Sequence, residues 1–375
     1  MAGIYIHIPF CKQACVYCNF HFSTSLNRKE EMLAAIHTEL ELQKHYLESP
    51  AIETIYLGGG TPSLLTADEI NRMTDHIAIH YNISGLKEYT IETNPDDLTQ
   101  QYIKSLKSTP VNRFSIGTQS FFDSDLQYMN RAHNAQEADY AIKAVQDSGF
   151  SNITIDLIYG TPGLTDNNWQ YNLQQVNNLG IPHFSAYALT VEEKTALHHN
   201  IKSGKSQPVN PEQSAHQFEI LMDFAAQSGF EHYEISNLAK PGHRALHNTN
   251  YWLGVPYIGI GPSAHSFNGI TRQWNIANNA LYIKSLLTDR KINFEEEILT
   301  TEQRLNEYIM TSLRTSWGLD IEKATREWGS DYTDAILKDS ERFIEEKKLI
   351  HNNNSLVLTN KGRLFADYIA GELFV

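Results

Sequence analysis

Residues 4–18 read IYIHIPFCKQACVYC. The apolar run at 4–8 has the β-branched composition of a buried strand. Cys11, Cys15 and Cys18 follow at once, and the chain of 375 residues has no other cysteine. A disulfide framework needs pairs of cysteines spread along the chain, so this cluster excludes one. Thiols gathered directly after a strand predict a site for a metal or a metal cluster.

Downstream of this segment, short apolar runs alternate with longer amphipathic stretches. Repeated strand–helix units predict an α/β fold with a parallel sheet. Six units are too few to close an eight-stranded barrel, so they fit either a partial barrel or a doubly wound sheet. A Thr66–Glu69 capping box and glycines at 149 and 180 support the helix positions. Strands are predicted at 4–8, 54–57, 88–93, 113–117, 153–159 and 184–189, and helices at 29–46, 67–81, 135–148 and 167–179.

The composition changes near residue 290. Beyond it the chain becomes helical and charged, and it then forms a predicted hairpin around Asn352–Asn354 and a last helix from Lys361. Helices followed by a hairpin resemble a winged helix. We therefore expect two domains, residues 1–294 and a small winged-helix-like domain at 295–375. The helices of the second domain are predicted at 302–315, 321–328 and 332–347.

The charge balance and the N-terminus limit the possible partners. Lys and Arg number 30 against 44 Asp and Glu, a net charge of −14, which disfavours binding to nucleic acid. The N-terminus lacks the basic region and cleavage site of a signal peptide. The longest uncharged stretch, 245–271, is interrupted by glycine and proline and does not predict a membrane span. These features predict a cytoplasmic protein with no nucleic-acid partner.

Three thiolates on one loop can hold three irons of a 4Fe–4S cluster. The fourth iron then stays open to an outside ligand, as a catalytic zinc keeps one open position. An open iron can chelate the amino and carboxylate groups of S-adenosylmethionine and supply one electron to cleave it. Two alternatives remain for the cysteines, a zinc site completed by His21 and a redox pair.

The spacing C-x-x-x-C-x-x-C, with Tyr17 before the last cysteine, resembles the radical SAM superfamily. This resemblance implies a partial (β/α)6 barrel with the cluster after the first strand. A second matching segment, GGGTP at 58–62, follows the second predicted strand. Its glycines allow close approach of a ligand, and exposed backbone amides there can bind a carboxylate. The alternative for this segment is a tight strand-to-helix turn.

Further segments resemble the oxygen-independent coproporphyrinogen III oxidase-like family and cover most of the chain. They are YIHIPF at 5–10, LGGGTP at 57–62, ETNP at 92–95, SIGTQS at 115–120, NR at 130–131, DLIYG at 156–160 and YA at 187–188. The resemblance implies roles for individual residues around S-adenosylmethionine. Tyr5 and Tyr17 would flank it and the cluster; Gly59, Gly60 and Thr61 would hold its methionine portion; Glu92, Gln119, Arg131 and Asp156 would bind its charged and hydroxyl groups; and Ala188 would lie near its adenosine.

Two departures separate this chain from the true oxidases of that family. The oxidases resemble C-x-x-x-C-x-x-C-x-C, and Phe20 stands here where their extra cysteine would be. They also carry an N-terminal extension, for which Cys11 leaves no room. HNTNYW at 247–252 instead resembles the haem chaperone branch, which makes His247 a candidate haem contact. The alternative is a polar loop in which His247 bonds to backbone and Trp252 lies in the core.

The resemblance implies a haem chaperone that binds a 4Fe–4S cluster, S-adenosylmethionine and haem and delivers haem to recipient haem proteins. It also implies a homodimer and peripheral contact with a membrane. The first alternative is an oxygen-independent coproporphyrinogen III dehydrogenase, which converts two propionates to vinyl groups, so enzymatic activity stays open. The second alternative is a zinc-stabilised binding protein.

Overall fold

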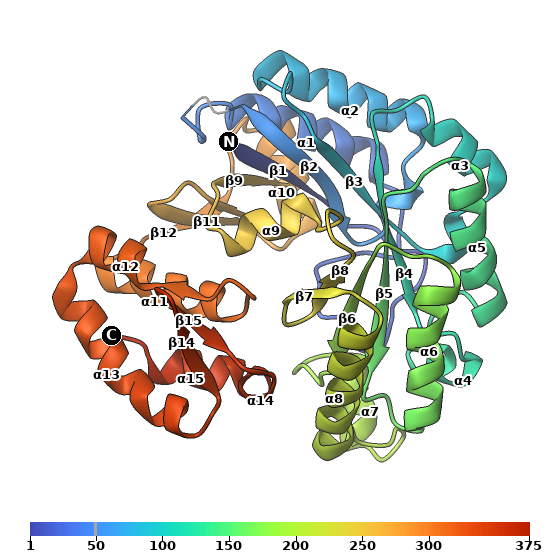
Figure 1. The fold of residues 1–375 in the computed structure, drawn as a ribbon. Helices are drawn as coiled ribbons and strands as arrows, with labels where there is room; N and C mark the ends of the chain where they lie inside the picture. Colours follow the sequence, from blue (N-terminus) through green and yellow to red (C-terminus); the bar gives the residue numbers. More distant parts are fainter. Residues whose placement is uncertain (49–50) are drawn as a thin grey trace.

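The computed structural model describes residues 1–48 and 51–375. Six strands lie side by side in the order of the chain, and each pairs parallel to the next. Among these six strands the spatial order therefore has no point at which it reverses. This order is that of a partial (β/α)6 barrel and not of a doubly wound sheet, which has a switch point. Figure 1 shows the strands as an arc with helices on its outer side. The strands are β1 (Ala2–Ile8), β2 (Ile52–Gly59), β3 (Glu88–Thr93), β4 (Arg113–Gln119), β5 (Ile153–Tyr159) and β6 (His183–Ala188).

The connecting helices begin and end where local signals predict. The capping box of Thr66 and Glu69 opens α2, and Gly149 and Gly180 have φ of 86° and 61° just beyond α5 and α6. Both observations confirm the predicted helix positions. The helices are α1 (Lys29–Leu42), α2 (Ala67–His80), α3 (Gln100–Leu106), α4 (Asp123–Tyr128), α5 (Ala135–Asp147), α6 (Asp166–Asn178), α7 (Ala196–Lys202) and α8 (Pro211–Gln227).

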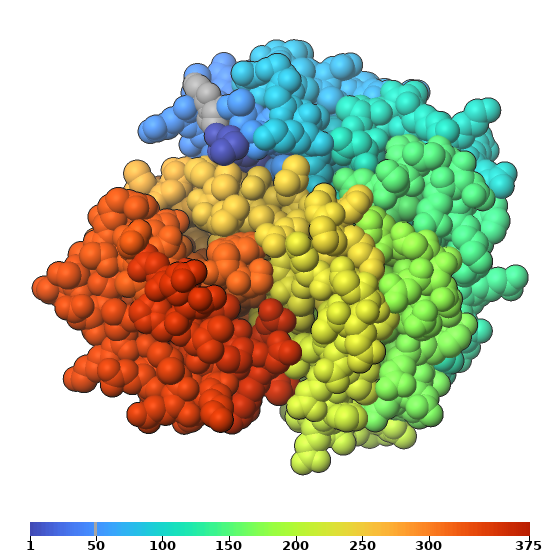
Figure 2. All heavy atoms as spheres, viewed as in Figure 1, coloured from blue at the N-terminus to red at the C-terminus, as the bar shows by residue number. Residues whose placement is uncertain are grey.

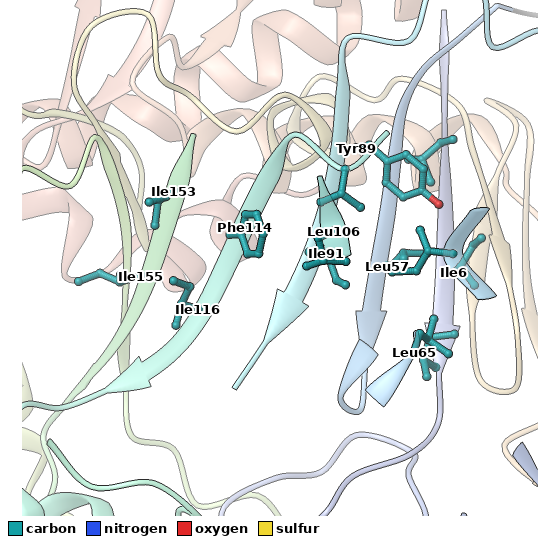
Figure 3. Close-up of a cluster of buried hydrophobic side chains, with 14 of the residues drawn as sticks. Ile6, Leu57, Leu65, Tyr89, Ile91, Leu106, Phe114, Ile116, Ile153 and Ile155 are labelled. Carbon is teal, nitrogen blue, oxygen red and sulfur yellow. The ribbon is translucent and has the colours of Figure 1, made fainter. Parts of the chain in front are cut away.

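The two faces of the arc differ in chemistry. Successive side chains of a strand point to opposite faces. The outer set is apolar and buried against the helices, as Figure 3 shows for Ile6, Leu57, Ile91 and Phe114. The inner set is largely polar and provides the side chains for a site inside the barrel. It comprises Gly3, Tyr5 and His7 on β1, Thr54 and Tyr56 on β2, Glu88, Thr90 and Glu92 on β3, Arg113 and Ser115 on β4, Thr154 and Asp156 on β5, and His183 and Ser185 on β6.

Short strands that the sequence did not predict extend the arc at both ends. Beyond β6 lie β8 (Asn237–Ala239) and β7 (Glu231–Glu234), and β9 (Tyr257–Ile260) pairs parallel to β1. Next to β9 come β10 (His265–Phe267), β11 (Thr271–Asn275) and β12 (Phe294–Ile298). Two helices accompany these strands, α9 (Leu246–Trp252) and α10 (Asn279–Leu287), and α9 lies on the inner side of the arc (Figure 1).

The C-terminal lobe has a hydrophobic cluster and a three-stranded sheet of its own. This helical lobe with a β-hairpin confirms the winged-helix-like arrangement. The proposed boundary after residue 294 falls within β12, which pairs with β11 of the barrel sheet. The elements are α11 (Thr301–Leu313), β13 (Leu319–Asp320), α12 (Ile321–Trp328), α13 (Ser330–Glu345), β14 (Leu349–Asn352), β15 (Ser355–Leu358), α14 (Asn360–Arg363) and α15 (Ala366–Glu372).

A hydrogen bond and an ion pair connect the lobe to the end of β7, at one edge of the arc. Ile235 N donates to Arg314 O of the lobe at 3.1 Å, and the Arg314 guanidinium pairs with Glu234 at 3.2 Å. Asp367 of the lobe also pairs with Arg314. In Figure 2 the lobe, orange to red, lies against the yellow part of the chain. Among the helices of the described residues, none combines the length and hydropathy that a bilayer span requires.

Candidate cofactor and ligand site

A cavity of about 930 Å³ lies at the carboxyl ends of the parallel strands. Ligand sites of such barrels are built at this end. Loops after the strands line one side of the cavity, and residues 363–368 of the C-terminal lobe line the other. The structure brings together all but two of the residues predicted from the sequence. Those that line the cavity are Cys11, Cys15, Tyr17, Cys18, Gly59, Gly60, Thr61, Glu92, Gln119, Arg131, Asp156 and Ala188.

Backbone hydrogen bonds hold the cysteine loop at its start and in its middle, where Val16 N donates to Met129 O at 3.2 Å, and the loop ends in a turn. Cys11 N donates to Ser23 O at 3.0 Å, and Cys18 N donates to Cys15 O at 3.3 Å. All three thiols are free and half-buried. Burial raises the pKa of Cys11 to about 11 and also raises the pKa of Cys18. Burial thus favours the protonated form of these two thiols, and a bound metal would supply the charge that stabilises the thiolates.

Arg131 joins the cysteine loop to the strand ends. Its guanidinium lies 3.3 Å from Cys15 Sγ and donates to Asn94 Oδ1 at 2.7 Å and to Gly117 O at 2.8 Å. Its Nε is buried without a hydrogen-bond partner. A buried donor without a partner is costly, so this atom is suited to an acceptor on a bound ligand. The cation also offsets the negative charge of thiolates beside it.

The glycine loop is shaped by its close approach to the end of β1. Gly59 has φ of +101°, and a Cβ at Gly60 would come within 2.5 Å of Phe10 O. The amides of Gly59, Gly60 and Thr61 donate to Glu92, Ile8 O and Phe10 O respectively. Each of these amides thus has an acceptor within the protein, and the acceptor of Gly59 is the carboxylate of Glu92, so the binding of a ligand carboxylate by these amides stays a prediction. The tight turn accounts for the glycines, although the loop still lines the cavity.

Two carboxyl groups face the cavity from β3 and β5. Glu92 accepts from Tyr56 OH at 2.8 Å and from Gly59 N at 3.1 Å. Burial, with a smaller effect from the charge of Asp156, raises the pKa of Glu92 to about 7. Burial likewise raises the pKa of Asp156 to about 6. Carboxyl groups held in this way can accept from the hydroxyl or ammonium groups of a ligand.

Gln119 ends β4 in a strained conformation. Its φ is +67°, in the left-handed region that residues other than glycine seldom adopt, and the register of β4 against β5 shifts between Ile116 and Gln119. Strain of this kind is stored at functional sites, and bulges redirect side chains there. The bulge turns Gln119 into the cavity wall.

Tyr5 and His247 are the two predicted residues that do not line the cavity. Tyr5 OH lies 3.1 Å from His7 Nδ1, deeper in the barrel. His247 is 2% exposed; its Nδ1 lies 2.8 Å from Thr54 Oγ1 and its Nε2 lies 2.8 Å from Tyr251 OH. Both ring nitrogens are thus engaged, so a bond to haem iron would require one of these two contacts to break. The haem contact of His247 stays a prediction.

The surroundings of His247 also differ from the alternative of a polar loop. His247 lies on a helix and bonds to side chains rather than to backbone. Trp252 is half-buried, with the Arg314 guanidinium 5.4 Å from its ring centroid. His21, the candidate fourth zinc ligand, has its Nε2 2.7 Å from Asn279 Oδ1. Within residues 1–48 and 51–375, no three His, Cys, Asp or Glu side chains are arranged to hold a single metal ion.

Several residues that line the cavity were not among the site residues predicted from the sequence. Asn94 and Ser115 line the strand side, and Arg363, Phe365 and Tyr368 come from the lobe. The alternation of polar and apolar residues in β3 and β4 was a signal for the first two. The sequence carried no signal for the others, because their place depends on how the lobe docks.

Known proteins resemble this chain over its whole length. Residues 5–175 match the radical SAM superfamily, and residues 299–365 match the HemN C-terminal domain. The haem chaperone HemW of Bacillus subtilis is 33% identical, over 99% of this chain and 98% of that protein. The haem chaperone HemW of Lactococcus lactis is 32% identical, over 96% of this chain and 93% of that protein. This chain belongs to the HemW family.

Membership of the HemW family agrees with the fold. Coproporphyrinogen III oxidase (HemN) from Escherichia coli, described as a radical SAM enzyme, superposes with a TM-score of 0.85. The match covers 100% of this chain and 90% of that protein at 21% identity, so it shows the fold alone. It confirms the radical SAM barrel and, with the HemN C-terminal domain, the second lobe.

Proposed function

We propose that this protein is a haem chaperone that binds a 4Fe–4S cluster, S-adenosylmethionine and haem, and delivers haem to recipient haem proteins. One observation carries the proposal. The three thiols, the glycine loop and the buried carboxyl groups line a single cavity, and that cavity continues under an aromatic and basic wall of the C-terminal lobe.

The residues present fit the cluster and S-adenosylmethionine. Cys11, Cys15 and Cys18 would hold three irons, and the bound cluster would offer an open iron and one electron to S-adenosylmethionine. The unpaired Nε of Arg131 supplies a donor for a carboxylate. Glu92 and Asp156 supply acceptors for hydroxyl or ammonium groups. Gln119 and Ala188 complete the wall on the side of β4 and β6.

The outer part of the cavity fits haem. Its wall carries Phe20, Phe22, Phe365 and Tyr368, whose rings suit a flat apolar macrocycle. Phe20 is 66% exposed, so an apolar surface is available there. Arg363 donates to His232 O at 3.2 Å, and no carboxylate of the described residues forms an ion pair with it. Burial lowers the pKa of Arg363, so an anionic propionate would stabilise this cation.

The substitution Arg363→Gln is expected to weaken haem binding about tenfold, because a charged hydrogen bond to a propionate is lost. A haem titration followed in the Soret region measures the effect. The matched control is Arg326→Gln, since the Arg326 side chain is 69% exposed and its ion-pair partner within the described residues is the neighbouring Glu327. Equal haem affinities for the two variants would remove Arg363 from the haem site.

Coproporphyrinogen III dehydrogenase is the second candidate function, because the chain shares its overall fold and its C-terminal domain with HemN. Phe20 argues against it, since this position lies in the cavity wall where the oxidases have a cysteine. Anaerobic incubation with coproporphyrinogen III, S-adenosylmethionine and a reductant tests it. We expect no multiple-turnover formation of protoporphyrinogen; many turnovers would show that chaperoning is not the whole function.

Delivery of haem to recipient haem proteins, the homodimer and the peripheral membrane contact stay predictions. A reducing cytoplasm would suit three free, half-buried thiols, which oxidation disables. The net charge of −14 supports the expectation that nucleic acid is not a partner.

A further inference from the structure

His247 closes the inner face of the barrel at the amino ends of the strands. Its ring contacts Thr54, the third residue of β2, and a Cβ at Gly3 in β1 would lie 3.1 Å from His247 Cε1. The cavity lies at the opposite, carboxyl ends. His247 and the cofactor site thus occupy the two ends of the same barrel interior.

The helix that carries His247 is firmly held. The amides of Leu246 and His247 donate to the two oxygens of Glu88 at 2.8 and 2.9 Å. Behind Glu88 lies the buried Arg113, with its Nε 3.9 Å from the carboxylate. A buried charge pair that also receives two amides fixes the start of α9 against β3 and β4.

Tyr56 contacts both His247 and Glu92, a residue of the cavity wall. The rings of Tyr56 and His247 stack with centroids 5.1 Å apart, and Tyr56 OH donates to Glu92 Oε1 at 2.8 Å. The other oxygen of Glu92 is held by Gly59 N. The hydroxyl of Tyr56 is therefore the side-chain contact that sets the rotation of the Glu92 carboxyl toward the cavity, and the imidazole supports the ring that carries this hydroxyl.

We propose that Tyr56, supported by His247, is a positioning residue that orients Glu92 for S-adenosylmethionine. This inference rests on the proposed function. Through His247 it gives the HNTNYW segment a supporting role beside the cofactor site, in addition to its predicted haem contact. His247 acts as a neutral imidazole with both nitrogens engaged inside the barrel.

The test is the affinity of the cluster-loaded protein for S-adenosylmethionine. Tyr56→Phe removes one hydroxyl and keeps the ring, and we expect binding about tenfold weaker with unchanged cluster content. The matched control is Tyr89→Phe, the same change on the outer face of β3, where the hydroxyl bonds to Thr74. The change that S-adenosylmethionine causes in the electron paramagnetic resonance spectrum of the reduced cluster should be altered in Tyr56→Phe and normal in the control.

A double-mutant cycle separates positioning from general damage. Combined with Glu92→Gln, Tyr56→Phe should cause no further loss of affinity for S-adenosylmethionine; additive losses would overturn the inference. His247→Gln, a second and independent variant, should weaken this binding in the same direction. Normal S-adenosylmethionine binding by His247→Gln would overturn the supporting role of His247, whatever the haem affinity of this variant. If the wild-type protein does not bind S-adenosylmethionine, the proposed function itself fails.

Discussion

Cys15→Ala is expected to abolish the iron–sulfur cluster and to leave haem binding close to that of the wild-type protein. Two thiolates, Cys11 and Cys18, cannot hold three irons. The substitution also removes the sulfur that lies 3.3 Å from the Arg131 guanidinium. Iron and sulfide content and the visible spectrum after anaerobic reconstitution measure the loss. Haem binding should survive because no cysteine belongs to the proposed haem wall, which includes Phe365 and Tyr368 of the lobe.

Gln13→Ala is the matched control for this loss. Gln13 lies in the same loop and donates to Asn130 O at 2.8 Å, but it carries no sulfur. The control should bind a full cluster. A cluster retained in Cys15→Ala would contradict ligation by the three cysteines, and zinc bound near one per chain in colourless wild-type protein would favour the zinc alternative.

Gly60→Ala is expected to abolish S-adenosylmethionine binding and to lower the free energy of unfolding by about 1–3 kcal/mol, because overpacking moves neighbouring atoms. The added Cβ would meet Phe10 O at 2.5 Å, Ile8 O at 2.7 Å and Phe10 N at 2.8 Å. These are backbone atoms, which cannot rotate away as a side chain can. The loop must therefore separate from the end of β1, where the cysteine loop begins. Chemical denaturation and equilibrium dialysis with S-adenosylmethionine measure the two effects.

Gly85→Ala tests whether any added methyl group has this effect. A Cβ at Gly85 meets no atom within 4 Å. This variant should be as stable as the wild-type protein and bind S-adenosylmethionine normally. If Gly60→Ala behaves like Gly85→Ala, close packing of the glycine loop on β1 does not matter for the site.

The sequence predicted the barrel because its signals are local. Each parallel strand is a short apolar run, and each helix has its own cap, as at Thr66 and Glu69. The added strands were missed because they are short and interrupted; β8 and β10 have three residues each. Such segments have no period that a pattern can detect, and only pairing with distant strands defines them.

The sequence predicted which residues form the site more fully than it predicted the contacts that these residues make. The cavity collects the cysteines and most of the predicted residues because all follow the carboxyl ends of strands. The place of His247 could not be predicted, since it depends on Thr54, a residue 193 positions away in the chain. The partners of the Gly59–Thr61 amides could not be predicted either, because they lie at the end of β1 and on β3 and depend on how these strands pack beside β2.

The most direct test of the proposed function is a haem titration of anaerobically reconstituted protein, paired with its iron–sulfur spectrum. We predict a 4Fe–4S spectrum and saturable haem binding in the same sample, followed by transfer of the bound haem to an apo haem protein. Protein that carries the cluster but neither binds haem saturably nor releases it to an acceptor would contradict the proposed function.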